Sequence, residues 1–266
     1  MPPQAVISLT TDFGLEDPFV GIMKGVILSR DPDLRVMDLC HGVPPGRVGI
    51  AGLWLGLSSR WLPRASVHVA VVDPGVGTDR AILCLRHAAQ CFLAPDNGLA
   101  AELRRHTDFD AIYKLDIEGD WACFSGAPPG NTFHGRDIFA PLAADLARGA
   151  IKPEQLGPPC DDCEVPSPLP LPRIHDRFID GEILLADHFG NLMSNICAAQ
   201  IPDGCRLRIS AGGESFGLVR TYAEAGSAAV VGVLNSFDLL EIACADGNAA
   251  GILGLGPGSP VRIEFG

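Results

Sequence analysis

The sequence predicts an α/β protein of two domains, the first with a mostly parallel sheet and the second with antiparallel strands. Three observations favour this fold class. Strand-like and helix-like runs alternate over residues 1–152, a Pro-rich stretch without periodicity covers residues 153–172, and only short strand-like runs follow over residues 173–266. A chain of 266 residues can hold a large and a small domain.

The first domain is predicted from alternation of the two hydrophobic periods. Apolar residues at helical spacing follow Asp17 and Pro18, which we expect to be the N-cap and the first helical residue. The run 67–72 is strongly β-branched, as in a buried strand. The expected strands are 5–9, 36–39, 67–72, 81–85 and 91–94, and the expected helices are 19–27, 48–62, 98–106 and 137–147. Such alternation is typical of a mostly parallel sheet covered by helices.

The Pro-rich stretch 153–172 is predicted to be a semi-rigid linker and the domain boundary, because seven prolines interrupt any periodic pattern. Turn residues separate the strand-like runs after it, which indicates a small antiparallel barrel or sandwich. The runs are 182–186, 192–196, 206–209, 215–219, 229–234, 239–243 and 261–265.

Composition narrows the function classes. A net charge of −12 without a basic run argues against binding nucleic acid, which needs clustered Lys and Arg. Apolar runs are too short to span a membrane, and the first residues lack the features of a signal peptide, so we expect a cytoplasmic protein. Nine cysteines sit mostly in apolar runs as buried thiols, and Cys160-x-x-Cys163 has no partner pair, so no metal site is expected.

Four loops that follow strands or precede a helix carry polar residues next to glycine: residues 10–14, 72–80, 94–98 and 131–137. In open α/β sheets, ligands bind beyond the carboxyl ends of the strands. Glycine lets the backbone approach a ligand closely. Together the loops predict a polar pocket. The sequence has neither a G-x-x-x-x-G-K-[ST] phosphate loop nor a G-x-S-x-G nucleophile elbow.

Each polar residue also has a purely structural interpretation. Asp12 and Asp96 suit ordinary turns. Asp73 and Arg80 suit an ion pair across a Gly-rich loop, and His134 suits a hydrogen-bonded, partly buried imidazole. Residue chemistry alone therefore predicts a pocket but names no reaction.

The motifs resemble those of the S-adenosylmethionine (SAM) hydroxide adenosyltransferases, which are close relatives of the bacterial fluorinase and chlorinase. The resemblance runs in order from the first strand to the last. The motifs that carry it are Thr10–Gly14, Asp17–Gly21, Val72–Thr78, Ala94–Gly98, Thr132–Asp137, Asp187–Asn191 and Asn235–Phe237.

The resemblance implies an N-terminal α/β domain with a mostly parallel sheet and a C-terminal antiparallel β-barrel domain. It implies hydrolysis of SAM to adenosine and L-methionine, by attack of a bound water on ribose C5′, with SAM as substrate and no metal or other cofactor. It also implies a homotrimer, in which the N-terminal domain of one subunit and the C-terminal domain of the next hold the substrate between them.

Carried over position by position, the resemblance assigns the catalytic set to Asp73, Arg80 and His134, which would hold and activate the water. The implied substrate-binding residues are Asp12 for the ribose hydroxyls, Asp187 and Ser236 for the amino-acid end, and Phe189, Asn191, Glu241 and the backbone around Cys244 for adenine.

Two other functions fit parts of the same pattern. One is a halogenase that forms 5′-chloroadenosine. Halide-binding relatives carry a Ser and an aromatic residue where this chain has Gly135 and Asp73, and a carboxylate repels an anion, so water is favoured. The other is a non-catalytic sensor of SAM or adenosine, which would not need Asp73, Arg80 and His134 together.

Overall fold

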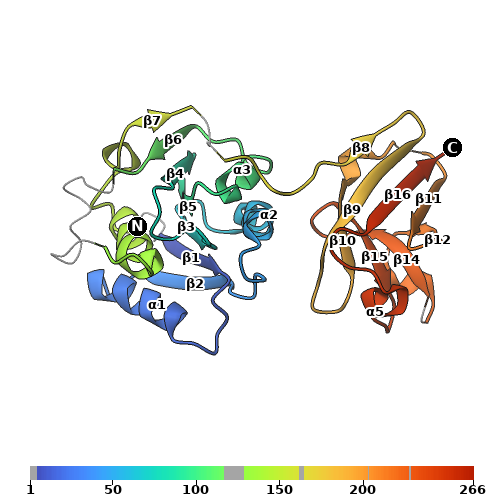
Figure 1. The fold of residues 1–266 in the computed structure, drawn as a ribbon, viewed down its shortest axis with the longest axis horizontal. Helices are drawn as coiled ribbons and strands as arrows, with labels where there is room; N and C mark the ends of the chain where they lie inside the picture. The colour runs from blue at the N-terminus through green and yellow to red at the C-terminus, as the bar shows by residue number, and fades with distance from the viewer. Residues whose placement is uncertain (1–4, 117–128, 162–164, 203, 228) are drawn as a thin grey trace. The chain divides into compact units, whose positions relative to one another are not determined.

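Two units divide the chain, Met1–Pro168 and Leu169–Gly266, and each is described by itself (Figure 1). The structure is a computed structural model that describes residues 5–116, 129–161, 165–202, 204–227 and 229–266. The division falls inside the Pro-rich stretch. The beginning of that stretch packs on the first unit, because Leu156 is fully buried and a short strand at Pro159–Cys160 joins the first sheet.

A seven-stranded sheet with the order β2-β1-β3-β5-β4-β6-β7 forms the centre of the first unit. Its strands are β1 (Val6–Thr11), β2 (Arg35–Cys40), β3 (Val67–Val71), β4 (Ile82–His87), β5 (Gln90–Pro95), β6 (Ala111–Lys114) and β7 (Pro159–Cys160). The pairs β1–β2, β1–β3 and β3–β5 are parallel, whereas β4, β6 and β7 join antiparallel. A tight turn through Ala88 links β4 to β5, and so short a link permits only antiparallel pairing. The prediction of a mostly parallel sheet is confirmed for the part that carries the polar loops.

Helices cover both faces of this sheet (Figure 1). They are α1 (Phe19–Arg30), α2 (Val48–Ser58), η1 (Ser59–Trp61), α3 (Leu99–Leu103), the π-helical turn η3 (Gly135–Phe139), α4 (Ala140–Ala147) and η4 (Pro153–Gln155). Ile7 and Leu9 of β1 share a core with α1 and α4, while α2 and α3 pack together on the other face. Asp17 and Pro18, expected as the N-cap and the first helical residue, each lie one position too early: Pro18 is the N-cap and the helix begins at Phe19. The helix expected over 137–147 begins earlier, as a π turn at Gly135.

The second unit is a nine-stranded sheet whose main path runs β12-β11-β16-β9-β10-β15-β14-β13, with β8 paired to β9. Its strands are β8 (Arg173–Ile174), β9 (Phe178–Ala186), β10 (Leu192–Cys197), β11 (Leu207–Ala211), β12 (Glu214–Phe216), β13 (Leu218–Val219), β14 (Val230–Leu234), β15 (Leu239–Cys244) and β16 (Pro260–Phe265). The short helices η5 (Ala198–Gln200), η6 (Tyr222–Ala225) and α5 (Ala249–Leu253) connect them. All pairs are antiparallel except β13–β14.

The ends of this strand path approach each other. Gly232 of β14 donates its N–H to the carbonyl of Gly217 between β12 and β13. A Cβ on Gly232 would lie only 2.0 Å from Cδ1 of Ile209 on β11, so glycine permits the close approach. The sheet is therefore a nearly closed barrel, and the predicted barrel is confirmed over the sandwich.

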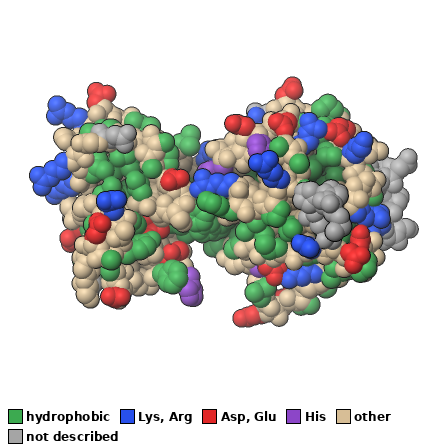
Figure 2. All heavy atoms as spheres, turned by 180° about the vertical axis from the view of Figure 1, so that it is seen from behind, with side chains coloured by type: hydrophobic (Ala, Val, Ile, Leu, Met, Phe, Trp, Pro, Cys, Tyr) green, Lys and Arg blue, Asp and Glu red, His purple; other side chains and the backbone are tan. Residues whose placement is uncertain are grey.

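The described residues also bear on membrane and metal binding. Within these ranges, no helix has the length and apolar character needed to cross a membrane. No cluster of three or more His, Cys, Asp or Glu side chains suited to a metal ion occurs there either. Cys160 lies in β7, and Cys163 lies outside the described residues. Acidic and basic side chains are interspersed on the face drawn in Figure 2.

Candidate functional site

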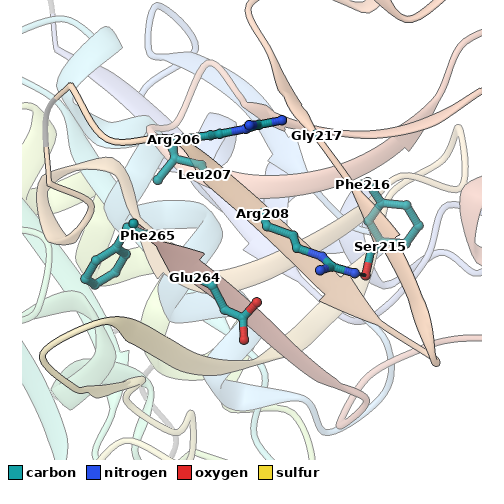
Figure 3. A pocket seen from close by; sticks show the side chains of 9 residues that line it. Arg206, Leu207, Arg208, Ser215, Phe216, Gly217, Glu264 and Phe265 are labelled. Carbon is teal, nitrogen blue, oxygen red and sulfur yellow. Dashed lines mark hydrogen bonds between the residues drawn. The ribbon is translucent and has the colours of Figure 1, made fainter.

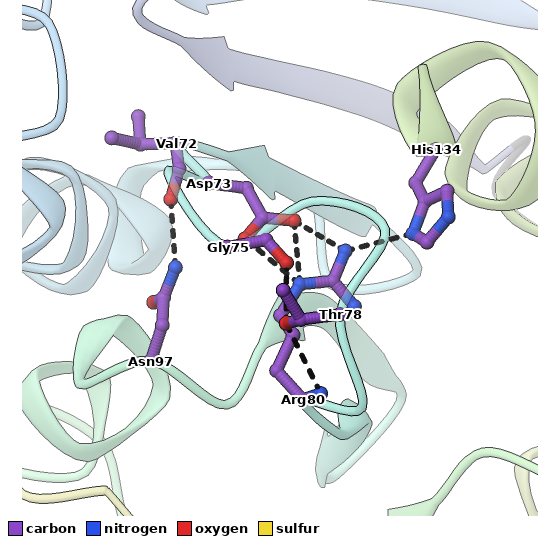
Figure 4. A network of polar contacts seen from close by, with 7 residues as sticks. All are labelled: Val72, Asp73, Gly75, Thr78, Arg80, Asn97 and His134. Atoms are coloured by element: carbon purple, nitrogen blue, oxygen red, sulfur yellow. Dashed lines mark hydrogen bonds and ion pairs between the residues drawn. The ribbon is translucent and has the colours of Figure 1, made fainter. Parts of the chain in front are cut away.

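A tight loop after β3 carries two of the predicted catalytic residues (Figure 4). Turn hydrogen bonds from Val76 to the Asp73 carbonyl and from Thr78 to the Gly75 carbonyl fold the loop back on itself. Arg80 is thereby brought under Asp73, and its Nε donates to Oδ1 at 2.8 Å and to Oδ2 at 2.7 Å. Its Nη2 also pairs with Oδ2, and the two side chains are only 8% and 3% exposed. The contact is a buried, multiply hydrogen-bonded ion pair.

The third predicted residue, His134, joins this pair from another part of the chain. It lies at the N-terminus of η3, and its Nδ1 is 2.8 Å from Nη2 of Arg80. Because a guanidinium has only donors, Nδ1 must accept this bond, which leaves the proton of the neutral imidazole on Nε2. Burial lowers the pKa of His134 below its usual value, and the charge of Arg80 lowers it further. His134 is therefore neutral and offers an Nε2–H.

A cavity of about 280 Å³ opens beside these residues. The predicted residues Asp12, Asp73 and His134 all line it, whereas Arg80 stands behind Asp73. The full lining is Asp12, Phe13, Gly46, Val71, Asp73, Pro74, Val76, Thr132, Phe133, His134 and Gly135. The loops after β1, β2 and β3 therefore meet at one edge of the sheet, as expected for a ligand site in an α/β fold.

Asp12 and two aromatic rings define the other side of the cavity. Oδ2 of Asp12 accepts a hydrogen bond of 2.9 Å from the backbone N–H of Gly46, in the loop after β2. Phe13 and Phe133 both line the cavity and meet edge to face, with ring centroids 5.9 Å apart. An oriented carboxylate beside apolar walls suits a ligand with hydroxyl groups and an apolar surface.

The loop 94–98 plays a different part from the other three. Oδ1 of the buried Asp96 accepts from the backbone N–H of Val165 at 3.3 Å. Nδ2 of Asn97 donates to the carbonyl of Val72 at 3.0 Å (Figure 4). Neither residue lines the cavity, so these contacts hold the end of β3 and the Pro-rich segment in place. The structural interpretation fits this loop.

In the second unit, the predicted residues Asp187, Phe189 and Asn191 form one turn after β9. Oδ1 of Asp187 accepts from the backbone N–H groups of Phe189 and Asn191 at 2.9 and 2.8 Å. Its Oδ2 accepts from Nδ2 of Asn191 at 3.2 Å. Gly190, at φ +83°, leaves no room for a Cβ against Asn248. This turn leaves the Phe189 ring 72% exposed.

The predicted Glu241 lies close to this turn, because it pairs across β10 and β15 with Met193, which follows Asn191 by two residues. Its carboxylate is buried in β15 and accepts from the Tyr222 hydroxyl at 2.8 Å and from Nδ2 of Asn235 at 3.0 Å. Burial raises the pKa of Glu241 above its usual range, and burial together with the bond to Glu241 raises the pKa of Tyr222 to about 12.

The two remaining predicted residues flank β15. Ser236 is exposed in the turn before that strand, next to Asn235, and Cys244 is buried at its end. Glu241 lies between them on the strand. The structure thus groups Asp187, Asn191 and Glu241 closely, with Ser236 and Cys244 at the two ends of β15.

Two further hollows among the described residues contain none of the predicted residues. One of about 630 Å³ lies over β11, β12 and β16, with the side chains of Arg206, Arg208 and Glu264 around it (Figure 3). Another of about 340 Å³ includes His87 and His106. The cavity beside Asp73 is the one in which the predicted catalytic side chains converge.

Comparison with known families decides what kind of site this is. Residues 7–157 match the model for the SAM hydroxide adenosyltransferase N-terminal domain, and residues 181–262 match the model for the C-terminal domain of the same family. The chain belongs to the SAM hydroxide adenosyltransferase family. This family is one of enzymes, and the resemblance drawn from the sequence motifs is confirmed.

Individual relatives of this protein point to the same family. An (R)-S-adenosyl-L-methionine hydrolase of Thermus thermophilus is 38% identical over 95% of this chain and 97% of its own length. One from Salinispora tropica is 36% identical over the full length of both. A fluorinase of Nocardia brasiliensis is more distant, at 25% identity over 98% and 97% of the two chains.

Solved structures show the same fold. A conserved protein from Thermotoga maritima, described as uncharacterized, superposes with a TM-score of 0.87 at 30% identity, over 97% of this chain and 99% of the other. A conserved hypothetical protein from Thermus thermophilus gives 0.76 at 36% identity, with the same coverage.

Some residues around both sites were not assigned from the sequence. Phe13, Phe133 and Asn235 stand inside the quoted motifs, so the motifs offered a signal for them. Gly46 follows the His41-Gly42 pair, and only the fold brings its N–H to Asp12. Tyr222 has no sequence signal at all, since only the packing of η6 on β14 and β15 brings its hydroxyl to Glu241.

Proposed function

We propose that this chain hydrolyses SAM to adenosine and L-methionine, by in-line attack of a bound water on ribose C5′, with Asp73, Arg80 and His134 as the catalytic set. The observation that carries the proposal is the buried Asp73–Arg80–His134 network on the wall of the cavity. Membership of the family, and relatives named as SAM hydrolases, support the same reaction.

The reaction requires two things of the site: an oriented water molecule and a base. Departure of the thioether neutralises the sulfonium charge, so the leaving group needs no general acid. The nucleophile is weak, so the site must hold water opposite sulfur at near-attack distance, and orientation alone can supply several kcal/mol. A positioned base adds about 10²–10⁴-fold.

Asp73 is the better candidate for that base. With Nδ1 of His134 accepting from Arg80, the neutral ring presents Nε2–H, which can only donate. His134 would therefore donate a hydrogen bond to the water oxygen and aim its lone pair at C5′. The Asp73 carboxylate keeps lone pairs beyond those that Arg80 occupies, and it can take the proton as the C–O bond forms. Arg80 would orient both side chains.

The substrate contacts follow the family pattern. Asp12, which lines the same cavity, would bind the ribose hydroxyls. In the second unit, Asp187 and Ser236 would bind the amino-acid end, and Phe189, Asn191, Glu241 and the backbone at Cys244 would contact adenine. We propose a homotrimer in which these residues come from the neighbouring subunit and complete a nucleoside-binding site. No cofactor or nucleic acid takes part, and we propose that the enzyme acts in the cytoplasm.

The halogenase alternative fits the cavity less well. A halide next to the ionised Asp73 would be repelled by it. At Gly135, where halide-binding relatives carry Ser, an added Cβ would lie 3.0 Å from the Phe133 ring and 3.1 Å from Sδ of Met23. The cavity as built therefore favours a neutral nucleophile.

Two variants test the proposal against the sensor alternative. Asp73→Asn and His134→Ala should bind adenosine with nearly the wild-type affinity by calorimetry, yet release methionine from SAM at least about 10²-fold more slowly. Asp96→Asn, changed at a carboxylate outside the cavity, serves as the control. If the wild-type protein binds adenosine but releases no methionine from SAM, the sensor interpretation replaces the enzyme.

A further inference from the structure

A second hydrogen-bonded chain lies beside the cavity and has no place in the reaction just described. Oγ1 of Thr11, at the end of β1, is 2.8 Å from Nδ1 of His41. Nε2 of His41 is 3.0 Å from Oδ1 of Asp38, and Oδ2 of Asp38 accepts from Nζ of Lys24 on α1 at 2.6 Å. Thr11 is fully buried, and the His41 side chain is 2% exposed.

The donor and acceptor of each hydrogen bond in this network follow from the Asp38 carboxylate, which can only accept. Burial opposes ionisation of Asp38, but the bonds from Lys24 and His41 keep its pKa below the usual value. The carboxylate must accept from Nε2–H of His41, so Nδ1 of a neutral ring accepts from the Thr11 hydroxyl. Oγ1 of Thr11 is then left to accept the backbone N–H of Phe13 at 3.2 Å.

The order Thr–His–Asp has the form of a nucleophile triad, but its location excludes that role. Thr11 has no exposed surface and is not part of the cavity lining. Strand alternation puts it on the face of Ile7 and Leu9, which pack against α1 and α4. Its hydroxyl already donates to His41 and accepts from Phe13. A substrate carbon cannot reach it.

This hydrogen-bonded network instead holds in place the turn that carries Asp12. His41 binds this turn twice: through Thr11, and through its own carbonyl, which accepts the N–H of Gly14 at 2.9 Å. Phe13 and Gly14 directly follow Asp12. The backbone N–H groups of these two residues bond to Thr11 and His41, so the backbone next to the Asp12 carboxylate depends on this network. β2 also has a register shift just before His41, opposite Leu9 and Thr10, and such bulges re-aim side chains.

We propose that Thr11, His41 and Asp38 are positioning residues that lock the turn Asp12–Gly14, and so set how tightly the enzyme holds the ribose of its substrate. The effect on the substrate rests on the proposed function, whereas the lock on the turn does not. Thr11 and His41 touch no substrate and act only through Asp12 and Phe13.

The test compares two hydroxyl deletions in one strand. Thr11→Val keeps the shape and β-branching but removes the bond to His41. Ser8→Ala removes the equally buried bond between Ser8 and Nδ1 of His68, 2.7 Å long, three residues earlier in β1. Thr11→Ser restores the hydroxyl. The readouts are the adenosine Kd, the KM and kcat for SAM, and amide hydrogen exchange at Phe13 and Gly14.

Thr11→Val is expected to raise the adenosine Kd and the KM about tenfold, with kcat within about threefold, and to speed exchange at Phe13 and Gly14. Ser8→Ala should leave all of these within about twofold of wild type, and Thr11→Ser should recover them. Unchanged exchange at Phe13 and Gly14 in Thr11→Val would overturn the lock itself. Faster exchange with an unchanged adenosine Kd would overturn the proposed effect of the turn on ribose binding. A wild-type protein that does not turn over SAM would overturn the proposed reaction but not the lock on the turn.

Discussion

Replacing Gly77 with alanine should separate the two loops that carry the catalytic set. Gly77 has φ +79°, and a Cβ there would lie 2.2 Å from the carbonyl oxygen of Asn131, at the start of the loop that carries His134. Relief of that contact to an ordinary separation of about 3.4 Å needs a shift of about 1.2 Å. If the two loops move apart by that amount, the 2.8 Å contact between Arg80 and His134 stretches to about 4.0 Å, which is no longer a hydrogen bond.

We expect Gly77→Ala to lower kcat/KM for SAM by about 10²-fold, the usual cost of misplacing a catalytic group by about 1 Å. A left-handed alanine also costs about 1–2 kcal/mol of stability. Gly149→Ala is the matched control, because Gly149 has φ +71° but nothing within 4 Å of an added Cβ. Methionine release and thermal unfolding are measured for both. Equal loss of stability with wild-type kcat/KM in Gly77→Ala would refute the reasoning.

Three further predictions concern protonation and cavity shape. Since burial and Arg80 lower the pKa of His134 below its usual value, the acid limb of kcat/KM should lie at a lower pH than the titration of an ordinary imidazole. Arg80→Gln should move that limb upward in a pH–rate profile. Burial lowers the pKa of His68 to about 3, so the unfolded state binds more protons below pH 6.5, and the free energy of unfolding should fall by about 1.4 kcal/mol per pH unit between 6.5 and 3. His68→Gln should remove this contribution in urea titrations. Gly135→Ser should lower kcat/KM about tenfold by displacing Phe133, and chromatography in chloride buffer should still detect adenosine; 5′-chloroadenosine would contradict our account of the nucleophile.

The convergence of the loops that carry Asp12 and Asp73 was predictable from the sequence. Asp12 and Asp73 each follow a buried apolar strand, and parallel strands bring their carboxyl ends to one edge. The place of His134 depends on η3, whose π turn begins before the helical pattern does. The link from Arg80 to His134 is a tertiary contact without a local signal.

Other features depended on long-range pairing. β6 is only four residues long and is held by its antiparallel pairing with β4, so periodicity alone did not reveal it. The helix expected over 98–106 shortens to Leu99–Leu103. The predicted linker loses its first residues to the first unit, because Leu156 fills a core position that no pattern around it marks.

The residues of the second unit that we propose to bind substrate show the same division. The turn Asp187–Asn191 is a local motif, with an Asp that caps its own backbone and a glycine at positive φ, so the sequence identifies it. The partners of Glu241 are different. Tyr222 comes from a short helix nineteen residues earlier, and only the packing of that helix on β14 and β15 brings its hydroxyl to the carboxylate.

Product analysis in ¹⁸O-labelled water tests the central claim most directly. The purified protein is incubated with SAM in chloride-containing H₂¹⁸O, and the products are separated and weighed by mass spectrometry. Attack of water on C5′ predicts adenosine and methionine in equal amounts, with the label on the 5′ oxygen of adenosine. Methylthioadenosine or 5′-chloroadenosine as the main product, or no product at all, would contradict it.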